Sequence, residues 1–295
     1  MSLDPAQIGA AFRAACLAEI DTLKPGNVHR FAPGHGMTAE TFETAADAAA
    51  PALASRGQPV GKRILAATRA SFGAVGVNAN LGIVLLCAPL AAAAERADAI
   101  AFETEEDGAD ALHEAVRTVL DDLDESDAIA AFAAIAWASP GGLGNRPKHD
   151  VRAAPTIGLV DAMALAADAD LVARQYVNGF ADVFEVGLAA INSSAYPEES
   201  CLGNGRALSA FLAFASRYPD SHIARKFGTV AAADCREGFR EFSKTLNDLS
   251  DWDERLALAR TFDRELKLNS LNPGTSADLT VASLFVKKLA QALSG

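Results

Sequence analysis

An alanine-rich pattern with helical spacing runs through almost the whole chain of 295 residues. In residues 170–191 the large apolar side chains recur every three or four positions, which places them on one face of an α-helix. The same spacing is found in residues 11–20, 131–138, 207–218 and 280–293. No segment shows the sustained apolar–polar alternation of a half-buried strand. The pattern predicts an all-α fold, a single large helical domain of residues 1–295 with about eleven to thirteen helices.

The charge of the chain narrows the classes of ligand that it can bind. The net charge of −12 argues against a nucleic-acid-binding protein and against docking on an anionic membrane, both of which need a basic face. An anionic small molecule stays compatible with this charge, because an acidic protein can hold a local cluster of cations. The four cysteines form no CxxC pair, which indicates buried free thiols and a cytoplasmic location.

Neither the N-terminus nor the longest apolar run has the pattern of an export or membrane signal. The N-terminus carries Asp4 and lacks an apolar run flanked by cations, so we do not expect a signal peptide. The longest apolar run begins at Leu81, is too short to span a bilayer and contains Pro89. It predicts a buried core helix.

The stretch EIDTLKPGNVHRF, residues 19–31, gathers polar side chains at the end of a predicted helix. Pro25 and Gly26 stop that helix. Glu19 lies just before the stop, and Lys24, Asn27, His29 and Arg30 lie around it. By itself the stretch is more typical of a helix terminus with solvated charges than of a binding site.

Three further polar breaks stand at predicted helix starts. In GVNANLG, Asn78 and Asn80 precede an apolar helix, where they can cap it or help its N-terminus to hold phosphate oxygens. In YPDSHIARKFG, Asp220 can cap a helix that carries Arg225 and Lys226. In LNPGTSADL, Thr275 or Ser276 can cap a helix with Asp278 in its first turn.

The segment SPGGLGNRPKHD is rich in glycine, so its backbone amides could approach a ligand closely. It lacks the ending of a P-loop, and no strand precedes it as in a dinucleotide-binding fingerprint. The chain also lacks HExxH and GxSxG sequences. The chemistry on offer is carboxylates, amides and cations, which suits magnesium and polyphosphate better than a covalent nucleophile.

In their order along the chain, KPGNVHRF after Glu19, GVNANLG, DSHIARKFG and NPGTSADL resemble the triphosphoribosyl-dephospho-CoA synthase family. The resemblance is greater to an archaeal-type branch, where KPGNVHR, NTNLGI, PGGLG, RKxG and NPGTTADL recur. It implies an all-α enzyme of cofactor biosynthesis. In the members that make the citrate-lyase and malonate-decarboxylase prosthetic groups, a ribose hydroxyl of dephospho-CoA attacks C1′ of ATP and adenine leaves.

The resemblance also implies roles for individual residues. The expected catalytic residues are Glu19, His29 and Asp278, and the expected Mg²⁺ ligands are Glu19, Asp150, Asp220 and Asp278. The expected ribose and phosphate contacts are Lys24, Gly26, Asn27, Asn78, Asn80, Arg225, Lys226, Gly274 and Ser276. The expected partners are ATP or another phosphorylated nucleotide and a small-molecule acceptor, and the alanine-rich surfaces would permit a homodimer.

The chain departs from the prosthetic-group makers at two places. They have Thr-His-Lys-Gly where this chain has Asn80 and Leu81 before Gly82, and an Asp-Met-Asp where Gly36 and Thr38 replace the aspartates. These differences favour a transferase with another acceptor, and the archaeal-type resemblance points to a cofactor of one-carbon metabolism. The alternatives are a non-catalytic phospho-ligand-binding or scaffold protein derived from the family, and a helical regulator.

Overall fold

The computed structural model describes residues 2–97, 104–138 and 155–294. The first half contains α1 (Pro5–Ile20), α2 (Ala39–Leu53), α3 (Val60–Val75), α4 (Leu81–Arg96), α5 (Glu105–Asp121) and α6 (Glu125–Ala138). The middle contains α7 (Leu159–Ala164), α8 (Leu171–Asn178), the π-helix η1 (Asp182–Leu188), α9 (Ala189–Asn192) and the strands β1 (Glu199–Ser200) and β2 (Gly203–Asn204). The last part contains α10 (Gly205–Arg217), α11 (Ser221–Phe227), α12 (Thr229–Asp248), α13 (Trp252–Leu268) and α14 (Gly274–Leu293).

The all-α prediction is confirmed. Thirteen of the helical segments in the described residues have seven residues or more, within the range expected from the sequence. The only regular strands there are β1 and β2, a two-residue antiparallel pair. None of the described helices combines the length and the apolar character needed to span a membrane.

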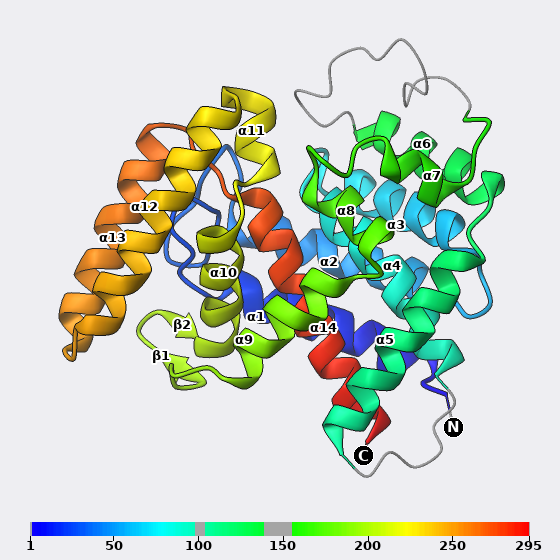
Figure 1. Cartoon of the computed structure of the whole chain (residues 1–295), viewed down its shortest axis with the longest axis horizontal. Coiled ribbons are helices and arrows are strands. Elements are labelled where there is room, and N and C mark those ends of the chain that lie inside the picture. The colour runs from blue at the N-terminus through cyan, green and yellow to red at the C-terminus, as the bar shows by residue number, and fades with distance from the viewer. Residues whose placement is uncertain (1, 98–103, 139–154, 295) are drawn as a thin grey trace.

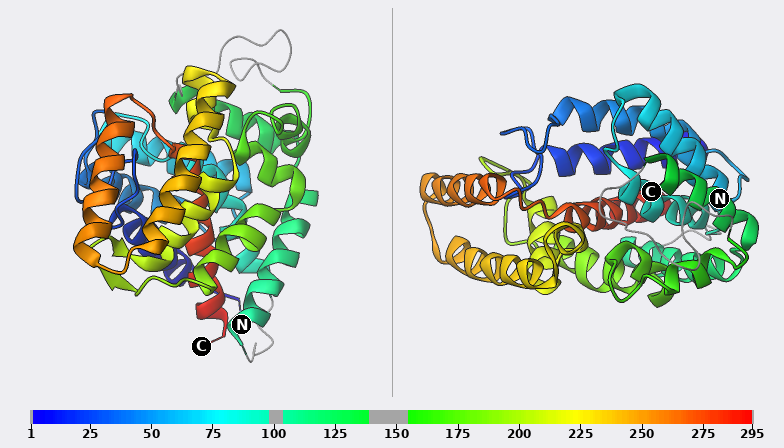
Figure 2. Two further views of the ribbon diagram at one scale, coloured as in Figure 1. Left: turned by 60° about the vertical axis from the view of Figure 1, so that its left-hand side comes forward. Right: turned by 90° about the horizontal axis from the view of Figure 1, so that it is seen from above.

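The C-terminal helix α14 is the centre of the molecule. It packs against α1, α4, α5, α10, α11 and η1. In Figure 1 it runs between the α10–α13 group on one side and the α2–α8 group on the other. Seen from above, it lies between a layer of α1–α3 and a layer that includes α10 and α12 (Figure 2). Its central place explains why buried residues occur all around it.

The core consists of two apolar clusters that meet along α10 and α14. The larger one joins α1–α6, α8, η1 and one face of each of these two helices. The smaller one includes Phe211 of α10, Phe239 and Phe242 of α12 and Ala277 of α14. The predicted core helix from Leu81 is confirmed as α4, which is buried from Ile83 to Ala94.

The helical segment expected over residues 170–191 is divided into three parts. Gly179 has a φ of 66° and Phe180 a φ of 62°, so the backbone leaves the right-handed helical region at both residues. The chain then continues as η1 and α9. The spacing of apolar residues survives this break, because both sides bury the same face, and it therefore gave no sign of the break.

The cap of α14 also differs from the expectation. Thr275 and Ser276 lie inside the helix, which begins at Gly274. The backbone amide and the hydroxyl of Ser276 both donate to Asp220 Oδ2, at 2.8 and 2.9 Å. An aspartate from α11's N-cap position thus caps α14, because the two helix starts are adjacent in space.

Candidate functional site

A cavity of 520 Å³ opens where several helix ends meet. Its lining includes the first residues of α4, α8 and α14, the last turn of α1, and one face of α11. The polar residues that line it are Glu19, Asn27, His35, Asn78, Asp170, His222, Arg225, Lys226, Asn272, Thr275 and Asp278. All four polar breaks at the predicted helix ends, EIDTLKPGNVHRF, GVNANLG, YPDSHIARKFG and LNPGTSADL, therefore contribute side chains to it.

The N-termini of α4, α8 and α14 give this cavity positive ends of three helix dipoles. Leu81 and Gly82 of α4, Val172 of α8, and Gly274 and Thr275 of α14 all line it. Helix N-termini favour anions, because their first amides lack intrahelical acceptors and their dipoles point the same way. The cavity therefore combines fixed positive ends with carboxylates, an arrangement that suits a metal-bound polyphosphate.

Glu19 and Lys24 form a buried ion pair at one side of the cavity. Lys24 Nζ lies 2.8 Å from Glu19 Oε1, and their side chains are 0% and 5% exposed. Burial raises the pKa of Glu19 and lowers the pKa of Lys24, while their mutual attraction opposes both shifts. Glu19 lines the cavity and Lys24 does not, so the phosphate contact predicted for Lys24 is not one that this arrangement offers directly.

Asp278 faces the cavity without a partner. Among the described residues, no hydrogen-bond donor or cation within bonding distance holds its carboxylate. Its pKa is raised well above the usual range, first by burial and then by the neighbouring Asp220 and Glu19. A Cβ at Gly82 would lie 2.1 Å from Asp278 Oδ2, so the carboxylate occupies the place that any side chain at position 82 would take.

Asp220 and Ser276 point away from the cavity. Asp220 is buried, and its two oxygens accept the amides of His222 and Ile223 as well as the amide and hydroxyl of Ser276. Burial still raises the pKa of Asp220. With four donors bound, Asp220 has little capacity left for a metal ion and Ser276 little for a phosphate, so both predicted roles lose support from the geometry.

The loop after α1 is fastened to α13 and α14. Asn27 Nδ2 donates to Asn272 Oδ1 at 2.9 Å, which joins KPGN to NPG, and both asparagines line the cavity. The amide of Gly26 donates to Asp263 Oδ1 at 2.9 Å. Gly26 has a φ of 81° and its missing Cβ would lie 2.9 Å from the carbonyl oxygen of Leu271. Glycine is thus needed there for packing, and Gly26 does not line the cavity.

His29 lies on the outer side of the same loop. Its Nε2 is 3.3 Å from Asp263 Oδ1 and 3.3 Å from Lys267 Nζ. Burial lowers its pKa. Because the ring is buried against α13 and does not line the cavity, an acid–base role for His29 would need a ligand to reach it by another route.

The two asparagines before α4 have different surroundings. Asn78 lines the cavity, and its Oδ1 accepts the amide of Leu81 at 3.2 Å. Asn80 is buried, accepts the hydroxyl of Ser71 at 2.6 Å and makes no side-chain cap bond. Asn78 is therefore placed to meet a ligand, whereas Asn80 holds α4 against α3.

One face of α11 supplies two cations to the cavity, and one of them, Arg225, forms an ion pair with Asp170. Arg225 and Lys226 both line the cavity, as predicted, with His222 one turn earlier. Arg225 lies 2.5 Å from Asp170, which also caps α8 through the amides of Val172 and Ala173. Asp170 is a cavity carboxylate that we did not predict, because a lone aspartate before a helix is an ordinary cap.

His222 is another cavity residue that the sequence analysis did not select. Burial, with Lys226 and Arg225 next in effect, lowers the pKa of His222 to about 4. Its Nε2 is buried without a hydrogen-bond partner. The ring packs against Gly274, which also lines the cavity, and stays uncharged at neutral pH.

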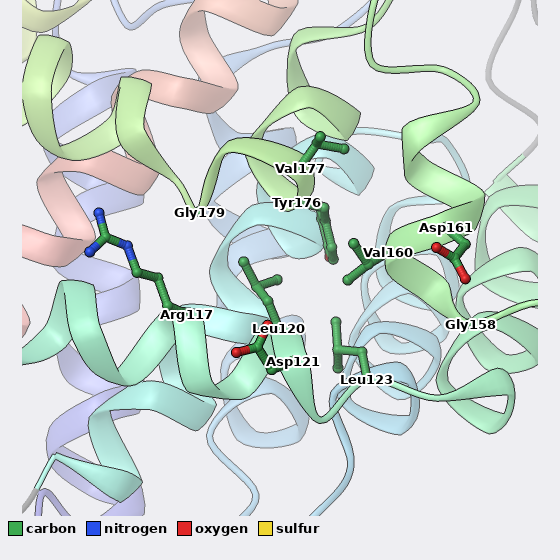
Figure 3. A pocket seen from close by; sticks show the side chains of 10 residues that line it. All are labelled: Arg117, Leu120, Asp121, Leu123, Gly158, Val160, Asp161, Tyr176, Val177 and Gly179. Atoms are coloured by element: carbon green, nitrogen blue, oxygen red, sulfur yellow. The ribbon is translucent and has the colours of Figure 1, made fainter.

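The rest of the cavity is apolar. Phe42, Leu85, Phe132, Ile135, Met163 and Leu165 lie on its other side. Asp150 and the SPGGLGNRPKHD segment lie outside the described residues. A second, open pocket of 400 Å³ lies between α5, α7 and α8 and contains none of the predicted residues. Its charged side chains, Arg117, Asp121 and Asp161, do not converge on one point (Figure 3).

Comparisons with known proteins identify the family of the chain. A family model described as ATP:dephospho-CoA triphosphoribosyl transferase (CitG) matches residues 5–295. The chain belongs to this family. A search of curated proteins found no match. The fold is similar to a crystal structure from Archaeoglobus fulgidus that is assigned provisionally as a triphosphoribosyl-dephospho-CoA synthase, with a TM-score of 0.63 and 23% identity over 85% of this chain and 98% of that one.

Membership of the family makes the chain a transferase that uses ATP, in cofactor biosynthesis. The structure also locates the two departures from the prosthetic-group makers. Gly36 and Thr38 do not line the cavity, and Thr38 precedes α2 as its N-cap. Leu81 does line it. The change from lysine to Leu81 therefore alters the lining of the cavity, whereas the changes from aspartate to Gly36 and Thr38 do not.

The cavity residues fit a magnesium ion that arrives with a nucleotide. Among the described residues, no three His, Cys, Asp or Glu side chains are close enough to hold an ion by themselves. Mg²⁺ usually keeps several waters and binds one or two carboxylates plus substrate phosphates. Asp278 has a carboxylate without a partner among the described residues, and its pKa is raised by burial and then by neighbouring negative charge, so a cation there would be favourable. Glu19 and Asp170 are the other carboxylates in reach of the cavity.

Proposed function

We propose that this protein transfers the triphosphoribosyl group of Mg-ATP to an acceptor that carries less negative charge than dephospho-CoA. The observation that carries the proposal is the convergence of three helix N-termini, two cations and three carboxylates on one cavity. The cations and helix ends suit the phosphates, and the carboxylates suit Mg²⁺ and the sugar.

The phosphates would lie against Arg225, Lys226 and the N-termini of α4 and α14. Asn27, Asn78 and Asn272 would donate to the ribose or phosphate oxygens. The Mg²⁺ ion, when bound, would neutralise phosphate charge, with Asp278 and Glu19 as its protein ligands. Free thiols and the use of ATP support a cytoplasmic location.

In the reaction, the bond between C1′ and the adenine nitrogen breaks and its electron pair leaves with adenine. A hydroxyl oxygen of the acceptor bonds to C1′ and loses its proton. The developing positive charge on the sugar would be stabilised by the carboxylates of Glu19 and Asp278. Burial and neighbouring negative charge raise the pKa of Asp278, which makes its carboxylate a stronger base toward the hydroxyl proton than an ordinary aspartate.

The acceptor is inferred from position 81. Leu81 lines the cavity where the prosthetic-group makers have a lysine. A phosphorylated acceptor such as dephospho-CoA would lose that contact, and each charge-assisted hydrogen bond to a phosphate contributes to binding. A less anionic acceptor, such as a one-carbon-metabolism cofactor or its precursor, loses nothing by the change.

The test is the release of free adenine from Mg-ATP, with and without dephospho-CoA. We expect ATP to bind in calorimetry and dephospho-CoA to be a poor acceptor for wild-type protein and a better one for the Leu81→Lys variant. Rapid adenine release from the wild type with dephospho-CoA would contradict the acceptor proposal. Absence of any nucleotide or polyphosphate binding would reject the transferase and favour the scaffold alternative.

A further inference from the structure

The side chain of Lys24 is enclosed behind the cavity lining. It is fully buried, and its ammonium contacts Glu19 Oε1 and the carbonyl oxygen of Val28, each at 2.8 Å. A phosphate could reach this ammonium only by displacing the Glu19 carboxylate. Removing one partner of a buried ion pair leaves an uncompensated charge, which is strongly unfavourable. Lys24 is therefore badly placed to bind a phosphate.

The same contacts fix the carboxylate that does line the cavity. Glu19 lies in the last turn of α1, and Lys24 reaches back to it from the loop that follows. One carboxylate oxygen, Oε1, is held by Lys24. Among the described residues, Oε2 has no hydrogen-bond donor, so it is the oxygen available to the cavity.

Lys24 also closes the loop that carries Asn27. Its hydrogen bond to Val28 joins the two ends of residues 24–28, and Asn27 within that loop donates to Asn272, which also lines the cavity. A single buried cation thus sets the position of a carboxylate from α1 and of an amide from the loop. Two neighbouring cavity groups depend on it.

We propose that Lys24 is a positioning residue, which orients the Glu19 carboxylate and the Asn27 loop toward the substrate and makes no contact with the phosphates. The inference rests on the proposed function and deepens it, because it separates two kinds of cation in one site. Arg225 and Lys226 line the cavity and bind substrate, whereas Lys24 acts through Glu19.

The experiment compares Lys24→Met with Arg225→Met, which both remove one cation and keep an unbranched chain. For Lys24→Met we expect kcat to fall about 100-fold, as when a reacting group moves by about 1 Å. Its Kd for tripolyphosphate without Mg²⁺, which needs no metal ligand, should stay within about threefold. For Arg225→Met we expect that Kd to rise at least about tenfold.

Lys267→Met is the matched control for the shape of the loop. Lys267 also braces this loop, through Asp263 at 3.0 Å and the carbonyl oxygen of Ala32, but does not touch Glu19. We expect its kcat to stay within about threefold of the wild type. An equal loss in both lysine variants would show that only loop structure is involved and would overturn the inference.

The double variant Glu19→Gln with Lys24→Met covers a failure of the single variant to fold. It removes both charges of the pair at nearly constant size, which buried pairs often tolerate. Its Kd for tripolyphosphate without Mg²⁺ should also stay within about threefold of the wild type, because the phosphates are held by Arg225 and Lys226 and not by Glu19. A Kd raised as much as in Arg225→Met, in either Lys24 variant, would overturn the inference alone. A wild type that binds neither Mg-ATP nor tripolyphosphate would overturn the proposed function and the inference with it.

Discussion

Two aspartates near the N-terminus of α14 have opposite environments: Asp220, the N-cap residue of α11, and Asp278 of α14 itself. Asp220 lies behind the helix end and binds four donors from α11 and α14. Asp278 lies on the cavity side, where none of the described residues holds its carboxylate, and burial with nearby negative charge raises its pKa. Both residues looked like cap or metal aspartates in the sequence. Asp220 therefore joins α11 to α14, whereas the carboxylate of Asp278 is available to a ligand in the cavity.

The largest effect is expected from removing the carboxylate of Asp278, which faces the cavity. Asp278→Asn should lower the rate of adenine release by about 10³-fold, since a positioned acid–base group typically contributes 10²- to 10⁴-fold. Its thermal stability should equal or exceed that of the wild type, because the substitution removes a carboxylate that pays for burial without a partner. An unchanged rate would place the chemistry elsewhere in the cavity.

A smaller loss of activity is expected from moving the same carboxylate without replacing it. In Gly82→Ala the new Cβ would overlap Asp278 Oδ2 and displace it, with a loss of about 10²-fold in kcat. Gly73→Ala is the control, because an added Cβ there meets no atom within 4 Å and the position lies in α3. That variant should keep full activity and gain up to about 1 kcal/mol in free energy of unfolding.

Removing the hydrogen bonds of Asp220 should reduce stability and not catalysis directly. Asp220→Ala leaves the amides of His222, Ile223 and Ser276 without their acceptor and should lower the free energy of unfolding by about 2 kcal/mol. Asp251→Ala removes an exposed cap of α13 that also binds two amides, and should cost only about 1 kcal/mol. Equal losses in urea unfolding would contradict the idea that Asp220 joins two helices.

The smallest effect concerns pH. His222 has a pKa lowered to about 4 in the folded protein, against 6.5 for the ordinary side chain. The unfolded chain binds more protons between these values, so this contribution to stability is complete above pH 6.5 and is lost as pH falls toward 4. We expect a difference of about 1 kcal/mol between wild type and His222→Gln in this window, after allowing for solvent at the cavity. Parallel stability curves for the two proteins would contradict a buried, neutral His222.

The sequence was a good guide to which segments meet and a poorer guide to which atoms face the ligand. Seven of the expected site residues line the cavity, where a ligand could reach them: Glu19, Asn27, Asn78, Arg225, Lys226, Gly274 and Asp278. Gly26 lies in the same polar breaks but does not line the cavity, and neither do the buried side chains of Lys24, His29, Asn80, Asp220 and Ser276. Their side chains are the kind that also cap helices and close loops, and residue type alone does not distinguish these uses.

Asp170 and His222 are among the polar cavity residues that were missed, and for a related reason. Asp170 looks like an ordinary cap, which it is, and it becomes a site residue only because Arg225 of α11 lies 2.5 Å away. His222 stands between a cap and two cations in the sequence. Its neutral state follows from burial beside those cations, which local sequence does not reveal.

The sequence by itself determined the all-helical fold, because helical spacing, caps and breaks are local properties of the chain. It also indicated the family, because four polar breaks occur in a fixed order. The tertiary structure decided which side of each helix end faces the cavity. Asp220 and Asp278 show why: the packing of α11 on α14 supplies donors to one carboxylate and leaves the other to a ligand. That outcome depends on contacts between residues 56 positions apart in the chain, which no local pattern records.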